Sequence, residues 1–186
     1  MHHPTIVVFR SSCRAIRGRG FDLLLYRTTM RESLIEILGL KDVVRTGWVR
    51  NNVSNPESVA AHSWGMAILA LKLTPKNLDL NKVLSLCLVH DIPEVRVGDL
   101  TPHDDCSTKS EDELNAMKEL SPEWLHLFEE YELGETEEAK FVKQLDKLDM
   151  GIQAMIYENR QGLDLSEFKE SALSKITNLE LSSLIE

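Results

Sequence analysis

Cysteine is scarce in this chain. Only three cysteines are present among 186 residues, Cys13, Cys87 and Cys106, and none belongs to a C-x-x-C pair. An odd number of widely spaced cysteines predicts neither a disulfide framework nor a zinc ribbon. We therefore expect reduced thiols, as in a cytosolic protein.

Long uncharged stretches and an excess of positive charge are also missing. The longest run without a formal charge, residues 58–71, contains a histidine and is shorter than the ~18 apolar residues of a membrane span. The formal net charge of -9 disfavours binding to a nucleic-acid polymer, which requires clustered Lys and Arg. The composition predicts no membrane and no nucleic-acid partner. It still allows a small phosphorylated ligand, because one metal ion or arginine can reverse a local potential.

The first 29 residues differ in composition from the rest. They contain a single acid, Asp22, and five arginines, at positions 10, 14, 17, 19 and 27. An Arg-rich, acid-poor start permits a mitochondrial transit peptide, and the alternative is an upstream start codon with the domain beginning at Met30. We treat residues 1–29 as a basic extension and residues 30–186 as one domain. Its expected location is the cytoplasm, or mitochondria if the extension is a genuine transit segment.

Beyond the extension the hydrophobic spacing is helical. Alternation with a period of two is found nowhere for more than a few residues, which disfavours strands. A first helix is expected to stop at Gly39. Pro56 and Glu57 suit the first turn of the next helix. Asn81 suits the N-cap of a third helix, which ends by Pro93. A long apolar stripe then runs from Thr136 until Gly162. The pattern predicts an all-α domain, a single bundle of about six helices.

Two histidines and an aspartate interrupt these apolar faces. His62 lies three residues after Val59, on a face that should be buried, but a lone histidine there is more often a hydrogen-bonded core residue than a ligand. His90 ends an apolar run, and its neighbour Asp91 is costly to bury without a cation or donors. Arg96 or a nearby backbone group could also meet that carboxylate.

The long helix contributes two further acids. Asp146 follows Val142 by four residues and Asp149 follows Leu145 by four, so both lie close to the buried stripe. Periodicity does not choose between them, and either could be a surface carboxylate beside lysines. Two imidazoles and two carboxylates from three helices would suit a divalent cation such as Mn, Co, Fe or Zn.

Three ordered blocks extend this pattern, VRTGWVRNNVSNPESVAAHS, LCLVHDIPEVRVGDLTPHD and AKFVKQLDKLDM. Together they resemble the HD-domain superfamily of metal-dependent phosphohydrolases, and within it the 5'-deoxynucleotidases of the HD-domain-containing protein 2 branch. The resemblance covers the chain from Ile35 to Tyr157. It implies an HD-domain helical bundle, hydrolysis of deoxyribonucleoside 5'-monophosphates to deoxynucleoside and phosphate, and a homodimer.

The resemblance also implies a role for individual residues. A divalent cation (Mn, Co, Mg, Fe or Zn) would be held by His62, His90, Asp91 and Asp146, which leaves Asp149 as a structural acid. Glu94 would be the catalytic carboxylate, Asp99 would bind the sugar, and Trp48 would shape the nucleotide pocket. Glu94 and Asp99 could also hold a second, weaker Mg.

Two positions depart from the family pattern. Many members have an acid just before the first histidine, and Ala61 stands there in this chain, so a contact that orients His62 is expected to be lost. The arginine that precedes the tryptophan in bacterial members is replaced by Gly47. Arg45 is the expected substitute for binding phosphate, with Arg50 next.

Other interpretations of the same residues stay open. Glu94 and Asp99 could belong to a solvated charged turn, and Trp48 could be an ordinary core aromatic. A phosphodiesterase or a nucleoside triphosphate hydrolase of the HD type would keep the metal and change the substrate. A non-catalytic helical interaction module is the third alternative.

Overall fold

The structure, a computed structural model, describes residues 19–101 and 103–186, with side chains from residue 28 onward. Within these residues the only extended pairing is one isolated bridge between Val44 and Ser58, and the all-α prediction is confirmed. The helices are α1 (Arg19–Leu38), η1 (Gly39–Asp42), α2 (Thr46–Arg50), α3 (Val59–Leu73), α4 (Leu80–Val89), α5 (Glu94–Val97), α6 (Lys109–Leu120), η2 (Pro122–Trp124), α7 (Leu125–Leu133), α8 (Glu137–Gln161), α9 (Ser166–Lys175) and α10 (Leu179–Ser182), where η marks a 3-10 helix. Among the described elements, seven α-helices have nine or more residues, close to the predicted six.

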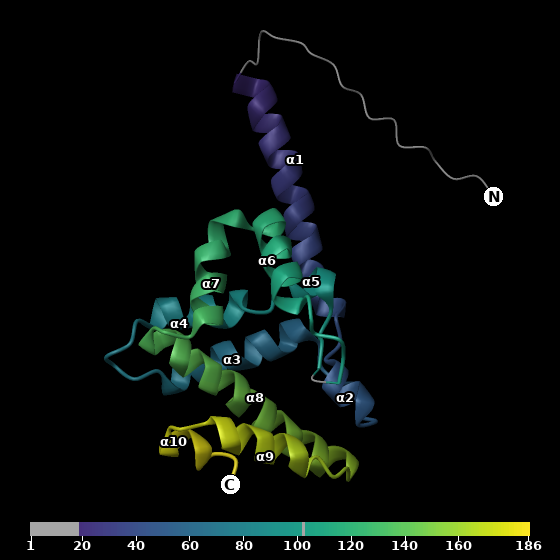
Figure 1. Cartoon of the computed structure of the whole chain (residues 1–186), viewed down its shortest axis with the longest axis vertical. Helices are drawn as coiled ribbons and strands as arrows, with labels where there is room; N and C mark the ends of the chain where they lie inside the picture. The colour runs from purple at the N-terminus through teal and green to yellow at the C-terminus, as the bar shows by residue number, and fades with distance from the viewer. Residues whose placement is uncertain (1–18, 102) are drawn as a thin grey trace, which may run out of the picture. The chain divides into compact units, whose positions relative to one another are not determined.

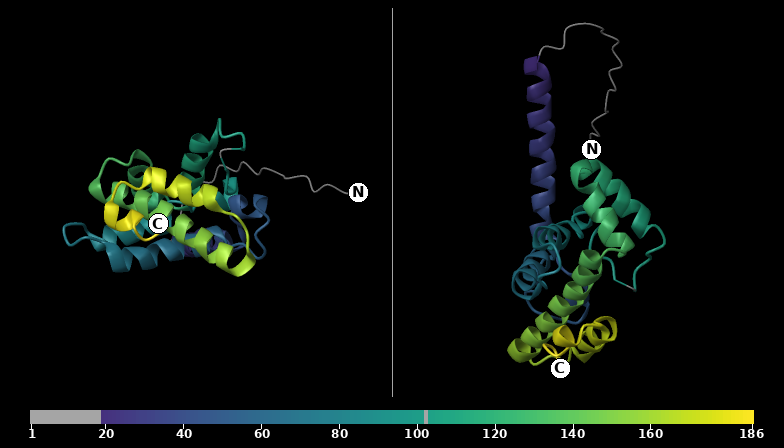
Figure 2. Two further views of the ribbon diagram at one scale, coloured as in Figure 1. Left: turned by 90° about the horizontal axis from the view of Figure 1, so that it is seen from below. Right: turned by 90° about the vertical axis from the view of Figure 1, so that its left-hand side faces the viewer.

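Residues 33–186 form one compact unit. Helices α3, α4 and α8 pack against one another at its centre, and α9 lies alongside α8 (Figures 1 and 2). The core between them includes the fully buried side chains Met66, Leu86, Leu145 and Leu148, and burying each stabilises the fold by about 1.5–3 kcal/mol. The three central helices carry or directly precede the histidines and acids singled out above, so packing of the core also assembles those polar residues.

Predicted helix ends agree with the structure where a single signal dominates. The Thr136 hydroxyl accepts a hydrogen bond from the Ala139 N–H at 3.2 Å, and α8 begins directly after it. At the other end Gly162 takes the left-handed conformation (φ 69°) that ends many helices. Gly39 likewise follows the last residue of α1.

The predicted starts of the second and third helices are wrong. Helix α3 begins only after Ser58, which supplies its side chain as the cap, so Pro56 and Glu57 precede the helix. Helix α4 is capped by Asp79, whose carboxylate accepts from the backbone N–H of Asn81 at 2.9 Å. Asn81 therefore lies inside the helix, because the aspartate two residues earlier already satisfies the first free N–H groups.

The basic extension can be compared with the structure only in part. Residues 1–18 and Cys13 lie outside the described residues, and the predicted boundary after residue 29 falls inside α1. Cys87 and Cys106 are free thiols. In the part of the chain that is described, no helix combines the length and apolarity needed to cross a bilayer.

Candidate active site

His62 lies on α3 with its side chain fully buried. Its Nε2 is 3.3 Å from Oδ1 of Asp146 on α8 and 4.0 Å from Oδ2 of Asp91. Its Nδ1 lies 2.8 Å from Oδ2 of Asp149. The ring is therefore held between three acids, two on one edge and one on the other.

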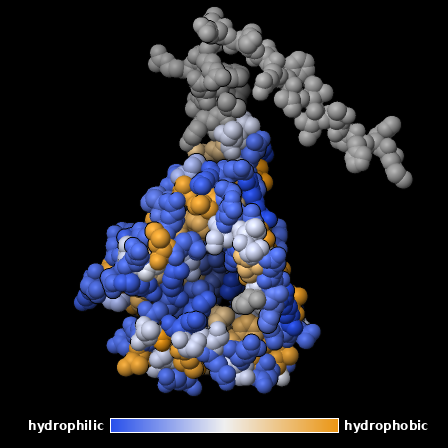
Figure 3. Space-filling view, in the orientation of Figure 1, coloured by the Kyte–Doolittle hydropathy of each residue, from blue (hydrophilic) through white to orange (hydrophobic). Residues whose placement is uncertain are grey.

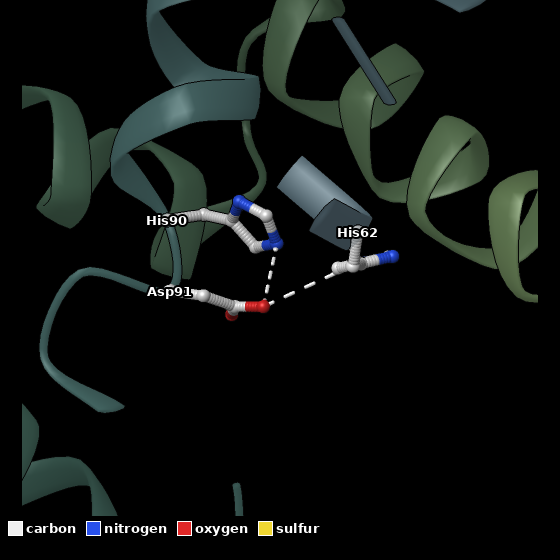
Figure 4. Close-up of side chains that lie close together, drawn as sticks. All are labelled: His62, His90 and Asp91. Carbon is white, nitrogen blue, oxygen red and sulfur yellow. Dashed lines mark ion pairs between the residues drawn. The ribbon is translucent and has the colours of Figure 1, made fainter. Parts of the chain in front are cut away.

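His90 and Asp91 follow the last turn of α4. The His90 Nδ1 is 3.0 Å from the Cys87 carbonyl oxygen. A carbonyl oxygen only accepts, so Nδ1 must donate and the neutral ring keeps its lone pair on Nε2. That Nε2 lies 3.1 Å from Oδ2 of Asp91, whose carboxylate is turned toward both histidines (Figure 4).

Asp146 occupies the remaining side of the cluster. The Tyr131 hydroxyl donates to its Oδ2 at 3.4 Å, and Lys147 Nζ lies 3.0 Å from the same oxygen. Its Oδ1 faces His62. Asp146 therefore lies on the Nε2 edge of His62 and Asp149 on the Nδ1 edge, a distinction that periodicity does not make.

These residues fit a divalent cation. Nε2 of His62 and Nε2 of His90 are buried without a hydrogen-bond partner, a costly arrangement that buried polar atoms rarely adopt. One ligand atom each of His62, His90 and Asp91 lie within 4.8 Å of one another, and Asp146 Oδ1 lies 3.3 Å from Nε2 of His62. Two imidazole nitrogens with two carboxylates are a donor set for a borderline divalent ion.

The positive charges around the cluster lower the pKa values of Asp91 and Asp146. Burial alone would raise the pKa of Asp91, but the neighbouring His90, His62 and Arg45 outweigh it and hold that pKa well below its usual range. Burial is likewise outweighed at Asp146, where the close His62 ring and the charge of Lys147 lower the pKa. Both carboxylates are ionised, as ligands of a cation must be.

His62 responds to the same acids. Burial and the charge of Arg45 lower its pKa, whereas the nearby carboxylates of Asp146 and Asp149 raise it, and the net result is a pKa of about 9. Without a cation the ring therefore carries a proton that balances part of the surrounding negative charge. A divalent cation would replace that proton.

Glu94 is the first residue of α5 and is almost fully buried. Its Oε2 has no hydrogen-bond partner, and Lys109 Nζ lies 3.8 Å from Oε1. Burial, followed by the charges of Asp91 and Asp99, raises its pKa to about 9. A solvated charged turn does not describe this residue, because the carboxyl is buried and keeps its proton at neutral pH.

Arg45 links Asp99 to the histidine cluster. Its Nη1 lies 2.9 Å from Asp99 Oδ1 and 3.8 Å from Asp91 Oδ2. The backbone N–H of Thr46 donates to the other Asp99 oxygen at 2.6 Å. Arg50 instead pairs with Asp104 at 2.5 Å, so of the two arginines Arg45 is the one in contact with the cluster.

Arg96 is not the partner of Asp91, so the alternative in which these two residues form an ion pair is wrong. Its guanidinium forms ion pairs with Glu36 and Glu119, at 2.6 and 2.5 Å.

Neither Glu94 nor Asp99 belongs to the groups of three or more potential ligands found among the described residues. The second Mg site therefore stays a prediction.

Trp48 is both a core aromatic and a cavity-lining residue. Its ring centroid lies 5.3 Å from that of Tyr157, edge to face, and 4.4 Å from that of Phe168. Its Nε1 donates to Glu57 Oε1 at 2.9 Å. Although only 2% exposed, the indole lines a cavity together with Arg45 and Asp99. Its role in a nucleotide pocket stays a prediction.

Two cavities adjoin these residues. One of about 620 Å³ is lined by Arg45, Trp48 and Asp99, and one of about 890 Å³ by His90, Asp91, Lys109 and Asp146 among others. Lys147 lines both. Figure 3 shows a hollow in one face of the molecule with hydrophilic side chains around it. The cluster is therefore reachable by a polar ligand.

Comparisons with known proteins place the chain in a family. A family model described as HD domain matches residues 37–185. The chain is 42% identical to 5'-deoxynucleotidase HDDC2 of Bos taurus, covering 94% of this chain and 88% of that protein. It is 37% identical to 5'-deoxynucleotidase hdd1 of Schizosaccharomyces pombe, covering 69% and 73% respectively.

A solved structure gives the same result for the fold. The PH0347 protein from Pyrococcus horikoshii OT3 superposes with a TM-score of 0.72 at 34% identity, covering 82% of this chain and 91% of that one. The family match spans most of the chain and includes His62, His90, Asp91 and Asp146. This chain belongs to the HD-domain family.

Proposed function

We propose that this protein is a metal-dependent 5'-deoxynucleotidase that hydrolyses deoxyribonucleoside 5'-monophosphates to deoxynucleoside and inorganic phosphate. The observation that carries the proposal is the pair of buried, unpartnered Nε2 atoms of His62 and His90 beside ionised Asp91 and Asp146. Relatives that bear the name 5'-deoxynucleotidase, at about 40% identity over most of the chain, support the choice of substrate.

His62, His90, Asp91 and Asp146 would hold the cation, which we propose to be Mn, Co, Mg, Fe or Zn. Such an ion, when bound, polarises the phosphate and makes a coordinated water more acidic. Asp91 also stays in contact with Arg45, at 3.8 Å from Nη1. The protein would thus present two kinds of positive charge to one phosphate group.

Glu94 would move the proton. In the cation-free protein this buried carboxyl has a pKa of about 9 and holds its proton at neutral pH. A proton held beside the cation site suits delivery to the leaving 5'-oxygen of the deoxynucleoside. Its Oε2 has no partner within the protein. A group arranged in this way is available for a proton transfer rather than committed to the fold.

Arg45, Asp99 and Trp48 would bind the nucleotide. A guanidinium carries five donors, and Arg45 approaches both Asp91 and Asp99 through Nη1, so it can hold Asp99 and also donate to phosphate. Asp99 accepts from Arg45 and from Thr46 N–H and retains lone pairs for a sugar hydroxyl. Trp48 would pack beside the sugar or base.

We further propose a homodimer that works in the cytoplasm. Trp64, Ile68 and Leu71 recur on one face of α3 and are 66%, 44% and 58% exposed, and large exposed apolar patches commonly mark protein interfaces. Light scattering on the wild type and Trp64→Glu tests this. A monomeric wild type would contradict the dimer without affecting the proposed reaction.

A phosphate-release panel tests the reaction. Protein stripped of metal and reloaded with Mn or Co is assayed on dAMP, dTMP, AMP, cyclic AMP and dGTP. Release from dAMP and dTMP is expected. Opening cyclic AMP to AMP frees no phosphate, and a triphosphate hydrolase can release triphosphate, so consumption of each nucleotide is also followed by chromatography. Consumption of only the cyclic nucleotide or the triphosphate would favour a phosphodiesterase or triphosphate hydrolase, and no consumption of any substrate would favour the non-catalytic module.

A further inference from the structure

Asp149 contacts the ring nitrogen of His62 that faces away from the proposed cation. Its Oδ2 lies 2.8 Å from Nδ1, whereas the opposite nitrogen, Nε2, faces Asp146 at 3.3 Å. The two aspartates lie one turn apart on α8 and reach opposite edges of one imidazole. The family resemblance assigns Asp149 no part in the site, and this contact gives it one.

Gly65 makes room for that contact. A Cβ added at this position of α3 would lie 3.0 Å from Cγ of Asp149 and closer still to Oδ1. Any other residue at position 65 would therefore displace the Asp149 carboxylate. Glycine in the interior of a helix weakens it relative to alanine, so the space that Gly65 leaves has a cost for α3.

We propose that Asp149 is a positioning residue for the cation site and that Gly65 is the residue that admits it. Asp149 accepts the Nδ1–H of His62, which fixes the neutral tautomer with its lone pair on Nε2 and holds the ring plane. Partners of this kind keep a ligating histidine oriented and make it a stronger ligand. This inference rests on the proposed function only through the cation, not through the substrate.

The same contact compensates for Ala61. Alanine at that position cannot provide the carboxylate that would orient His62. Asp149 provides a carboxylate from a different helix. The acid therefore reaches His62 across the α3–α8 interface rather than from the preceding residue of α3.

A second cation beside the Nδ1 edge is the rival explanation. One ligand atom each of Glu57, His62 and Asp149 lie within 4.8 Å of one another, and Glu57 also accepts from Trp48 Nε1 at 2.9 Å. A neutral imidazole has one donor and one acceptor nitrogen. A ring that donates Nδ1–H to Asp149 cannot also ligate a cation through Nδ1, so the hydrogen-bonding role is the one we adopt.

The test is the affinity of the stripped full-length protein for Mn, measured by calorimetric titration without any nucleotide. Asp149→Ala should weaken binding about 10- to 100-fold. Asp149→Asn should weaken it less, because the amide oxygen still accepts from Nδ1–H. Gly65→Ala should resemble Asp149→Ala, and the double variant should be no worse than Asp149→Ala alone, since the two changes remove one contact.

Gly151→Ala is the matched control. It also adds a methyl group inside a helix, but that group meets the side chain of Ile185 at 2.8 Å and no acid. It should lower the melting temperature and leave Mn affinity unchanged. Unchanged Mn affinity in Asp149→Ala would overturn the inference. So would a titration in which this variant binds the first Mn ion as the wild type does and loses only the binding of a second ion. If Asp149→Ala weakens Mn binding but the wild type hydrolyses none of the nucleotides, the role of Asp149 is supported and the proposed function is refuted.

Discussion

Nη1 of Arg45 lies 2.9 Å from Oδ1 of Asp99, although 54 residues separate the two in the sequence. The same Nη1 is 3.8 Å from Asp91 at the histidine cluster. One half-buried arginine therefore joins the acid proposed to bind the sugar to an acid proposed to bind the cation. Substrate recognition and the cation site belong to a single charge network.

Arg45→Ala should lower kcat/KM for dAMP about 100-fold, equivalent to about 2.7 kcal/mol. The variant loses a donor to phosphate and leaves Asp91 and Asp99 without their shared counter-ion. Steady-state kinetics at saturating Mn measures the change. Arg50→Ala is the control, because Arg50 lines the same cavity but pairs with the partly exposed Asp104, and it should change kcat/KM by less than about threefold. Equal losses in the two variants would contradict the role of Arg45.

Glu94→Gln should lower kcat by about 10²- to 10⁴-fold, the usual contribution of a general acid or base. Mn affinity should stay close to that of the wild type, because Glu94 is not among the proposed ligands. Glu113→Gln provides the comparison, since Glu113 also lies near Lys109, at 3.4 Å. A Glu94→Gln enzyme with Mn bound and full kcat would show that the proton moves by another route.

Cation binding should stabilise the fold. A ligand at 100 times its Kd adds about 2.7 kcal/mol, which for a chain of this size corresponds to a rise in Tm of about 5–11 °C. Thermal melts of stripped protein with and without Mn measure the rise. His90→Ala should show little of it, because that change removes one of the two unpartnered Nε2 atoms. An equal rise in His90→Ala would mean that Mn binds elsewhere.

The cation-free protein should lose stability as pH increases from 6.5 to 9. His62 and Glu94 both have folded pKa values of about 9, raised from 6.5 and 4.5. In this window the folded state therefore binds more protons than the unfolded state, and stability falls with rising pH. The contributions of Asp91 and Asp146, whose pKa values are lowered, are lost only on acidification.

Melting temperatures of stripped protein between pH 6.5 and 9 check this expectation, and Glu94→Gln should reduce the slope. Stabilisation by Mn should grow over the same range, because His62 must lose its proton to bind a cation. A Tm that rises with pH in the absence of metal would contradict the assignment.

Much of the helical framework could be predicted because local signals specify it. Thr136 and Gly162 bound α8 as expected, since a hydroxyl cap and a left-handed glycine act within one turn. Asn81 is not the cap of α4, because a cap depends on which side chain satisfies the free N–H groups first, and Asp79 does so. Helices of one turn, such as α5, are too short to leave a periodic pattern.

The site itself depended on information that periodicity does not contain. Asp146 and Asp149 lie near the same stripe of α8, and both contact His62, so only the ring nitrogen that each one reaches separates their roles. That distinction arises from the packing of α3 against α8. Gly65 was the available signal, a glycine one turn after His62 inside a helix, and its meaning required knowing which side chain lies opposite.

Phosphate release from dAMP during stepwise addition of Mn to stripped protein tests the central claim most directly. We predict that release rises with Mn until about one ion is bound per chain and that His90→Ala stays inactive throughout. Release by the stripped wild type or by His90→Ala at the wild-type rate would contradict the account.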